Sequence, residues 1–226
     1  AGGVAVQGGG ANQRLACADS EENRVLIFNV ASGELVCSVG ETWGHGKLYE
    51  PRGAAFNSRG ELYVSDCHLD QVFVYDVDGA YVRKFGSHGS ENGQFDFPLG
   101  LAVTCEGEVV VADCNNHRVQ VFLDDGTFVR TMGSRGEGDG EFRYPRGVGV
   151  CADGSIVVLD SGNDRVQVLS GGGDFVRSFG CLGDEPGQFR NADGVAVGAG
   201  GEILVADSRR KDVQVFSREG AHVQTI

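Results

Sequence analysis

The sequence has little proline, no hydrophobic run long enough to cross a membrane, and no helical periodicity of useful length. Only 4 of its 226 residues are proline, whereas 37 are glycine and 41% are hydrophobic. This composition is typical of many short strands joined by tight turns. We therefore expect an all-β protein that lacks a membrane-spanning segment.

Positive charge is also scarce. The chain has 19 Lys and Arg residues against 32 Asp and Glu residues, which gives a formal net charge of −13. Such a field repels nucleic acid and anionic lipid, so RNA binding would need a locally basic surface. The first ten residues have neither the charged region nor the hydrophobic core of a signal peptide, and we expect a cytoplasmic protein.

The cysteines form no metal-binding or disulfide pattern. There are seven, an odd number, and none belongs to a CxxC pair. We interpret them as free thiols in a reducing compartment and expect neither a disulfide scaffold nor a zinc site. We predict that the domain uses no metal and no cofactor.

The dominant feature that is present is a repeat of 47 residues. It is marked by an aspartate that recurs without slippage, at Asp19, Asp66, Asp113, Asp160 and Asp207. The repeated units cover approximately residues 3–40, 53–86, 100–133, 147–180 and 194–226. A period of this length indicates stacked supersecondary units, which must be identified before any local structure is assigned.

Each unit contains four strand candidates. In the third unit these are residues 100–103, 108–113, 118–122 and 127–132, and the turns between them carry Glu106-Gly107 and Asp125-Gly126. Four short antiparallel strands repeated five times predict a β-propeller that forms a single domain over residues 1–226. Between units, Leu48, Phe95, Phe142 and Phe189 are predicted to fill the gap between neighbouring blades.

The motifs of the units resemble a known family. A P-x-G opening is followed by V-x-D-x-x-N-x-R-V-Q-V-F and then by F-V-R-x-[FM]-G, as in the third unit. This combination resembles the NHL repeat over essentially the whole chain. Many NHL propellers have six blades. The five repeats favour a five-bladed ring here, and a six-bladed ring completed by residues outside this sequence is the alternative.

The resemblance also implies a function. NHL propellers form the C-terminal domain of tripartite-motif ubiquitin ligases, where one face recruits protein substrates or binds RNA. The chain begins and ends at repeat boundaries, and we expect it to be such a domain of a longer protein. The isolated domain is expected to be a monomer, whereas the full-length protein would assemble through a coiled coil outside this sequence.

The repeats can be compared with one another to separate scaffold from site. The recurring aspartates close one strand, and Arg24, Arg118 and Arg165 open the next. We predict that these pairs tie the connecting turn by charge-assisted hydrogen bonds. Positions that vary between units but share one loop face are candidates for recognition. We predict a partner-binding surface of Tyr49, Arg52, Phe97, Leu99, Arg143, Tyr144, Arg146, Arg190, Arg209, Arg210 and Lys211.

Within this surface, the basic residues are expected to engage acidic groups of a protein partner, with the aromatic residues and Leu99 as apolar anchors. The first alternative is single-stranded RNA, with arginine on phosphate and aromatic rings stacked on bases. A metal-dependent lyase or a lectin is less favoured. No metal-ligand motif is evident, and Trp43 is the only tryptophan, whereas a lectin of this kind would repeat an aromatic platform in every blade.

Overall fold

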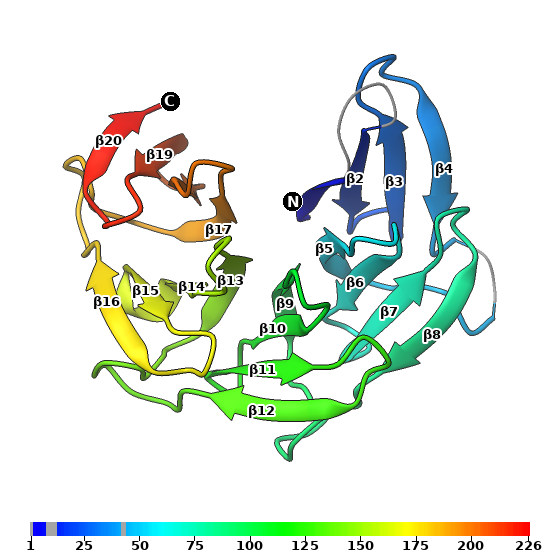
Figure 1. Cartoon of the computed structure of the whole chain (residues 1–226), viewed down its shortest axis with the longest axis horizontal. Helices are drawn as coiled ribbons and strands as arrows, with labels where there is room; N and C mark the ends of the chain where they lie inside the picture. Colours follow the sequence, from blue (N-terminus) through cyan, green and yellow to red (C-terminus); the bar gives the residue numbers. More distant parts are fainter. Residues whose placement is uncertain (1, 8–12, 42–43) are drawn as a thin grey trace. The chain divides into compact units, whose positions relative to one another are not determined.

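A computed structural model describes residues 2–7, 13–41 and 44–226, so that Trp43 lies outside the described residues. The fold is an all-β propeller with five blades, and each blade is a sheet of four consecutive strands (Figure 1). No helix in the described ranges has the length and hydrophobicity needed to span a lipid bilayer. The predictions of an all-β fold and of five four-stranded blades are confirmed.

The strands follow the repeat. Blade 1 contains β1 (Val4–Gln7), β2 (Arg14–Asp19), β3 (Arg24–Asn29) and β4 (Leu35–Val39), and blade 2 contains β5 (Pro51–Phe56), β6 (Leu62–Asp66), β7 (Gln71–Tyr75) and β8 (Tyr81–Phe85). Blade 3 contains β9 (Pro98–Val103), β10 (Val109–Asp113), β11 (Arg118–Phe122) and β12 (Phe128–Met132). Blade 4 contains β13 (Pro145–Val150), β14 (Ile156–Asp160), the short 3-10 turn η2 (Ser161–Asn163), β15 (Arg165–Leu169) and β16 (Phe175–Phe179). Blade 5 contains β17 (Ala192–Val197), β18 (Ile203–Asp207), β19 (Asp212–Phe216) and β20 (His222–Thr225).

The first strands of blades 2 to 4 begin earlier than the sequence indicated. In blade 3, β9 starts at Pro98 and not at residue 100, and in blade 4, β13 starts at Pro145. Proline lacks a backbone N–H but can occupy the first position of a strand, where no donor is required. Pro145 lies opposite Asp160, and the register then shifts between Pro145 and Gly147.

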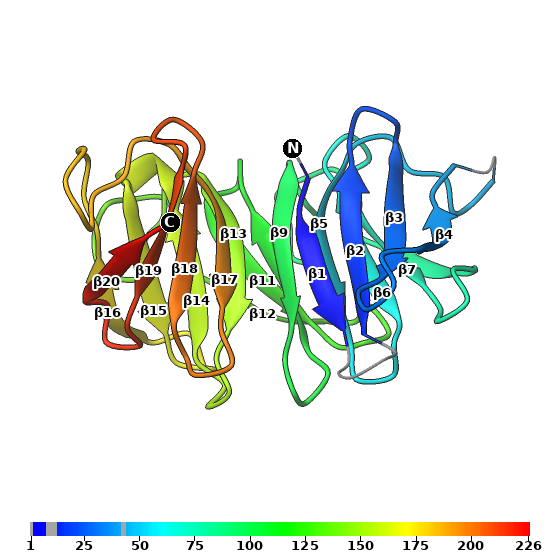
Figure 2. The ribbon, with the colours of Figure 1, turned by 90° about the horizontal axis from the view of Figure 1, so that it is seen from above.

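The chain divides into two compact units. The first comprises residues 1–111 and 121–129, and the second comprises residues 112–120 and 130–226. Within the first unit, β1, β5 and β9 lie side by side, and within the second unit β13 lies beside β17 (Figure 2). That residues 1–226 form one domain stays a prediction.

Glycine is required where these first strands approach each other. A Cβ atom on Gly53 would lie 2.4 Å from the Leu99 carbonyl oxygen, and one on Gly147 would lie 2.9 Å from Val195 Cγ1. Neither distance is compatible with a side chain. The P-x-G motif therefore combines a strand start with the small residue that close packing of neighbouring strands demands.

The second strand of each inner blade is buried on both faces. All five residues of β6, β10 and β14 are buried, which explains the absence of strict alternation in their sequences. The predicted gap-filling residues Leu48, Phe95, Phe142 and Phe189 are all fully buried. The ring of Phe95 lies 5.3 Å from that of Phe122 in the first unit.

Candidate functional site

The recurring aspartates join two loops that are far apart in sequence. The Asp160 carboxylate is fully buried and accepts the backbone N–H of Arg143 at 2.7 Å. It also accepts Arg165 Nε at 2.8 Å and Asn163 Nδ2 at 2.9 Å. Arg143 precedes the blade, whereas Asn163 and Arg165 follow its second strand. One buried carboxylate therefore fixes both the turn within the blade and the connection that enters it.

The turn within the blade is tied by the aspartate in the other blades too, with or without the arginine. Arg118 Nε donates to Asp113 at 2.7 Å, and Arg24 Nε donates to Asp19 at 3.4 Å. In blade 2, where the arginine is replaced, Asp66 accepts the backbone N–H groups of Tyr49, Glu50, His68 and Leu69. The carboxylate is thus present in every blade, whereas the arginine adds a further hydrogen bond only in some of them.

The hydrogen bonds of Asp207 also decide its ionisation. Burial alone would raise its pKa, but the backbone N–H groups of Arg190, Arg210, Asn191 and Arg209 donate to it, and the balance lowers the pKa. The aspartate is held ionised, as an acceptor for several backbone donors requires. The sequence predicted only the contact within the turn, and not the hydrogen bonds from Asp207 to the connection that enters the blade.

A buried glutamine in the third strand makes a second tie that sequence reasoning missed. Gln167 is fully buried; its Nε2 donates to the Glu141 carbonyl at 2.6 Å, and its Oε1 accepts the Gly140 N–H at 2.9 Å. Gln214 makes the equivalent contacts in blade 5. A polar residue that recurs inside an apolar strand was the available signal, because such a group must find buried partners.

These ties bring the two loop types together on one face of each unit. In the first unit, the rings of Tyr49 and His68 stack at 5.7 Å between centroids. In the second unit, the rings of His117 and Tyr144 meet edge to face at 4.5 Å. The predicted meeting of the turn after the second strand with the connection before the first strand is therefore observed.

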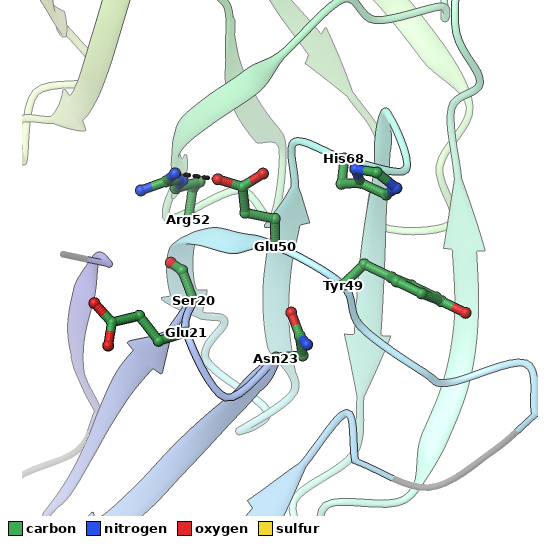
Figure 3. Close-up of a pocket in the computed structure, with 7 residues that line it drawn as sticks. All are labelled: Ser20, Glu21, Asn23, Tyr49, Glu50, Arg52 and His68. Carbon is green, nitrogen blue, oxygen red and sulfur yellow. Dashed lines mark hydrogen bonds and ion pairs between the residues drawn. The ribbon is translucent and has the colours of Figure 1, made fainter.

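A polar hollow of about 440 Å³ opens on this face of the first unit (Figure 3). Arg52 and Glu50, which both line it, point toward one another and form an ion pair. The Ser20 hydroxyl donates to the Pro51 carbonyl at 2.6 Å, which holds the blade 1 turn against the connection. The hollow is lined by Ser20, Glu21, Asn23, Tyr49, Glu50, Arg52 and His68.

Each unit has, on its own loop face, one exposed aromatic residue with an unusual backbone conformation. Phe97 has φ of 61° and Tyr144 has φ of 48°, in the left-handed region that bulky residues rarely adopt. The two residues are 36% and 43% exposed. The Phe97 N–H donates to Asp70 Oδ1 at 2.8 Å, and the Tyr144 N–H donates to His117 Nδ1 at 3.1 Å. Each strained residue is thus held by a side chain from the neighbouring turn.

Leu99 has a different position from these aromatic residues. It is the second residue of β9 and is half-buried. Its carbonyl accepts the Ser65 hydroxyl, and it also lies against the close approach at Gly53. The backbone of Leu99 therefore takes part in strand packing, and a role of its side chain in partner binding stays a prediction.

Most of the predicted basic residues in the second unit are already paired with carboxylates. Arg143 Nη1 lies 3.0 Å from Glu137 Oε1, and Arg210 Nη2 lies 2.9 Å from Asp212 Oδ2. The remaining pairs are Arg146 with Asp193 and Arg190 with Asp184. Among the described residues, no ion pair involves Arg209 or Lys211, both of which are exposed. The local positive charge is therefore much smaller than the sequence suggests.

A comparison with protein families identifies the repeat. Residues 95–122, 142–169 and 189–216 each match the NHL repeat. Each matched stretch runs from the buried phenylalanine of a connection to the end of the third strand. It therefore contains both the aspartate tie and the loops of the candidate face. No curated protein matches the chain.

Solved structures share the fold at low sequence identity. A nidogen/laminin complex structure matches with a TM-score of 0.76 at 19% identity, over 99% of this chain and 78% of that chain. A virginiamycin B lyase from Staphylococcus aureus matches with a TM-score of 0.71 at 15% identity, over 99% and 68%. A gluconolactonase from Xanthomonas campestris matches with a TM-score of 0.70 at 16% identity, over 98% and 74%. At such identities the likeness concerns the fold alone.

The connection between blades 2 and 3 also gathers groups that are able to bind a metal ion. Asp70, His88 and Asp96 each offer one ligand atom, and these atoms all lie within 4.8 Å of one another. They come from the turn after β6 and from two points of the following connection. Since no two of them form a short sequence motif, the cluster could not be recognised from the sequence.

Proposed function

We propose that this chain is a protein-recognition domain that binds its partner through the loop face of its NHL repeats. We further propose that it serves as the C-terminal, substrate-recruiting domain of a ubiquitin ligase of the tripartite-motif kind. In this role it performs no chemistry itself. It acts by positioning a bound protein, and affinity and specificity come from side chains on loops fixed by the recurring aspartates.

The observation that carries this proposal is the pair of exposed aromatic residues in left-handed conformation. A bulky residue in this region costs roughly 1–3 kcal/mol, and such strain is concentrated at functional sites. Phe97 and Tyr144 also expose apolar rings to solvent, where burial by a partner would be favourable. Rigid aromatic residues of this kind are typical anchors of protein interfaces.

The electrostatics of the face favour a protein partner over RNA. Phosphate binding depends on cations that are free to replace counterions, and Arg143, Arg190 and Arg210 are held by carboxylates. A protein partner can share or exchange such ion pairs. Arg209 and Lys211 remain available for acidic side chains of the partner, and Arg52 lines the hollow of the first unit.

The comparisons support the proposal in a general way. The repeats are of the NHL type, and one structure with the same fold comes from a complex between two proteins, nidogen and laminin. The lyase and the lactonase share the fold at 15% and 16% identity, which carries no activity over to this chain. We therefore propose a binding domain and not an enzyme.

We also propose a cellular compartment and an oligomeric state for the protein. All seven cysteines are free thiols, which suits a reducing compartment, and we place the protein in the cytoplasm. We propose that the isolated domain is monomeric and that a coiled coil outside this sequence makes the full-length ligase oligomeric.

The test compares anchor variants with matched apolar controls. Proteins cross-linked to the purified chain in cell extract are identified, and the affinity of each is then measured with purified components by isothermal titration calorimetry. We expect Phe97→Ser and Tyr144→Ser to weaken binding at least about tenfold, as hot-spot residues do. Val129→Ser and Val176→Ser, which change equally exposed residues of the outer strands β12 and β16, should leave the affinity unchanged. Equal loss in anchor and control variants would refute the proposed face.

A second experiment tests whether the partner is RNA and not a protein. The chain is incubated with a random single-stranded RNA pool at about 150 mM salt, beside an Arg209→Glu/Lys211→Glu variant. We expect no enriched sequence. Enrichment that the double variant abolishes, with affinity falling steeply between about 50 and 200 mM salt, would replace the protein partner by RNA.

A further inference from the structure

We propose that Asp70, His88 and Asp96 form a binding site for a divalent first-row transition metal ion, with at least one coordination position open. The site lies in the first unit, where the turn after β6 meets the connection between β8 and β9. This inference goes beyond the proposed partner binding and does not depend on it. Three observations support it: the distances between the ligand atoms, the hydrogen bonds that hold the ligands in place, and the different residues at the equivalent positions of other units.

The three ligand atoms are already close to coordination distance. His88 Nδ1 lies 2.8 Å from Asp70 Oδ2, and the ligand atoms of all three residues lie within 4.8 Å of one another. Ligands about 2.0–2.2 Å from a zinc-sized ion are separated by roughly 3–4 Å. The His88 side chain is 74% exposed and can rotate into place at little cost. Small side-chain movements therefore complete the site.

The backbone under His88 and Asp96 is fixed by a buried phenylalanine. Residues 88 and 95 form a parallel β-bridge, in which the Phe95 N–H donates to the Ser87 carbonyl at 2.8 Å and the Gly89 N–H donates to the Phe95 carbonyl at 2.9 Å. The Phe95 side chain is fully buried. Asp96 follows this anchor directly, and His88 lies opposite it. Two of the three ligands are thus held by one rigid backbone contact.

Asp70 is oriented by a hydrogen bond to its other oxygen. Its Oδ1 accepts the Phe97 N–H at 2.8 Å, while its Oδ2 faces His88. The side chain is only 14% exposed. Groups that hold a ligand in this manner raise metal affinity because the ligand loses little freedom on binding. The arrangement leaves one oxygen of Asp70 directed at the site.

The other NHL-type units supply internal comparisons. The same β-bridge joins Arg135 to Phe142 and Leu182 to Phe189. One repeat after Asp70, His88 and Asp96, the equivalent residues are His117, Arg135 and Arg143, and one repeat further they are Asp164, Leu182 and Arg190. Only the first of these three sets consists entirely of metal-ligand residue types. Asp70 has the same residue type as Asp164, so the cluster departs from both other units at the positions of His88 and Asp96.

The ligand types indicate the class of ion. One imidazole and two carboxylates suit zinc, cobalt, nickel or manganese, whereas calcium and magnesium prefer oxygen ligands alone. Three protein ligands leave a position for water or for a group of another molecule. The hollow lined by Tyr49 and Arg52 does not include His88. The ion would therefore be bound at the surface and not inside a closed catalytic cavity.

The test is metal titration of the 226-residue chain by isothermal titration calorimetry. Cobalt and zinc chlorides are used, with magnesium and calcium chlorides for comparison. Cys105→Ser and Cys181→Ser are present in every protein, because these exposed thiols would bind zinc. We expect one cobalt or zinc ion per chain. His88→Gln and Asp96→Asn should each weaken binding at least about tenfold. His45→Gln, which removes another exposed loop histidine, should have no effect.

Thermal unfolding with and without cobalt gives an independent measurement. The metal should raise the melting temperature of the parent but not of His88→Gln, because only the folded parent binds it. Absence of uptake by the parent, or unchanged affinity in both ligand variants, would overturn the proposal.

The repeat also permits a gain of function. The variant His117→Asp/Arg135→His/Arg143→Asp places the same three residue types on the equivalent backbone of the second unit. We expect it to bind two ions per chain. A folded triple variant that binds only one would overturn the claim that these three positions on this backbone make the site.

Discussion

The connections at residues 86–98 and 133–145 have a similar backbone conformation, but the charged side chains beside their exposed aromatic residues are of opposite sign. In each, a fully buried phenylalanine forms a parallel bridge, and an exposed aromatic residue in left-handed conformation precedes a proline. Beside Phe97 lie two carboxylates and a histidine, whereas beside Tyr144 lie a histidine and two arginines. The backbone is set by residues that both connections share. The chemistry can therefore change at a few loop positions without altering the fold.

The largest effect is expected from a change to the shared framework. Asp160→Ala removes a fully buried carboxylate, so that Arg165 Nε and the Arg143 N–H lose this acceptor and Gln167 Nε2 keeps only the Glu141 carbonyl. Loss of one partner from a buried charged network costs about 3–5 kcal/mol. We expect a loss of this size in the free energy of unfolding, measured with urea.

The control for Asp160 is an exposed carboxylate in the same unit. Asp184 pairs with Arg190, and its side chain is 68% exposed. Asp184→Ala should change the free energy of unfolding by no more than about 1 kcal/mol. Similar values for both variants would show that the aspartate tie does not hold the connection.

Relief of backbone strain should have a smaller effect and should differ between the two connections. Phe97→Gly removes about 1–2 kcal/mol of left-handed strain and adds about 0.5–1 kcal/mol of unfolded-state flexibility. We expect a net stabilisation of about 1 kcal/mol by thermal and urea unfolding. Tyr144→Gly should gain less, because the Tyr144 ring packs on His117. Destabilisation by Phe97→Gly would show that its ring, and not its backbone conformation, dominates.

The connection at 133–145 should also respond to pH. Burial, with Arg135 and Arg143 nearby, lowers the pKa of His117 against a smaller opposing effect of Asp160. The neutral ring is favoured in the folded state, and Nδ1 accepts the Tyr144 N–H. Stability from this contact is therefore complete above the unfolded pKa of about 6.5 and is lost as pH falls through the folded pKa.

The measurement is urea unfolding between about pH 7.5 and 5, compared with His117→Asp, which places the residue type of Asp70 at this position. The loss on acidification should amount to about 1.4 kcal/mol for each unit by which the pKa is lowered. The variant should lack that part of the pH dependence. An identical pH profile in both proteins would mean that His117 does not titrate differently on folding.

The smallest effect is expected at the surface ion pairs. Arg143→Gln breaks the contact with Glu137, in which both side chains are substantially exposed. Such pairs contribute about 0–1 kcal/mol, so the midpoint of unfolding should barely change and should be insensitive to salt. A loss above about 1 kcal/mol would show that this arginine belongs to the framework.

Much of the framework could be predicted from the sequence because it depends on local and repeated features. The 47-residue spacing of Asp113 and its equivalents gave the blade number, and Gly107 and Gly126 gave turns that the structure shows with positive φ. The family match extends only over residues 95–122, 142–169 and 189–216, yet the first two blades have the same strands. Repetition allowed the weaker units to be identified from the clearer ones.

Sequence alone determined the fold, the aspartate and arginine positions and the loops that vary, since each is encoded by neighbouring residues or by the repeat. Which side chains of those loops meet one another depends on the tertiary structure. It paired Arg190 with Asp184 and so neutralised a surface that appeared basic. It also brought His88 within 2.8 Å of Asp70, 18 residues away in sequence. The physical reason is that charge pairing and metal ligation depend on distances of a few ångströms between segments whose separation no local pattern records.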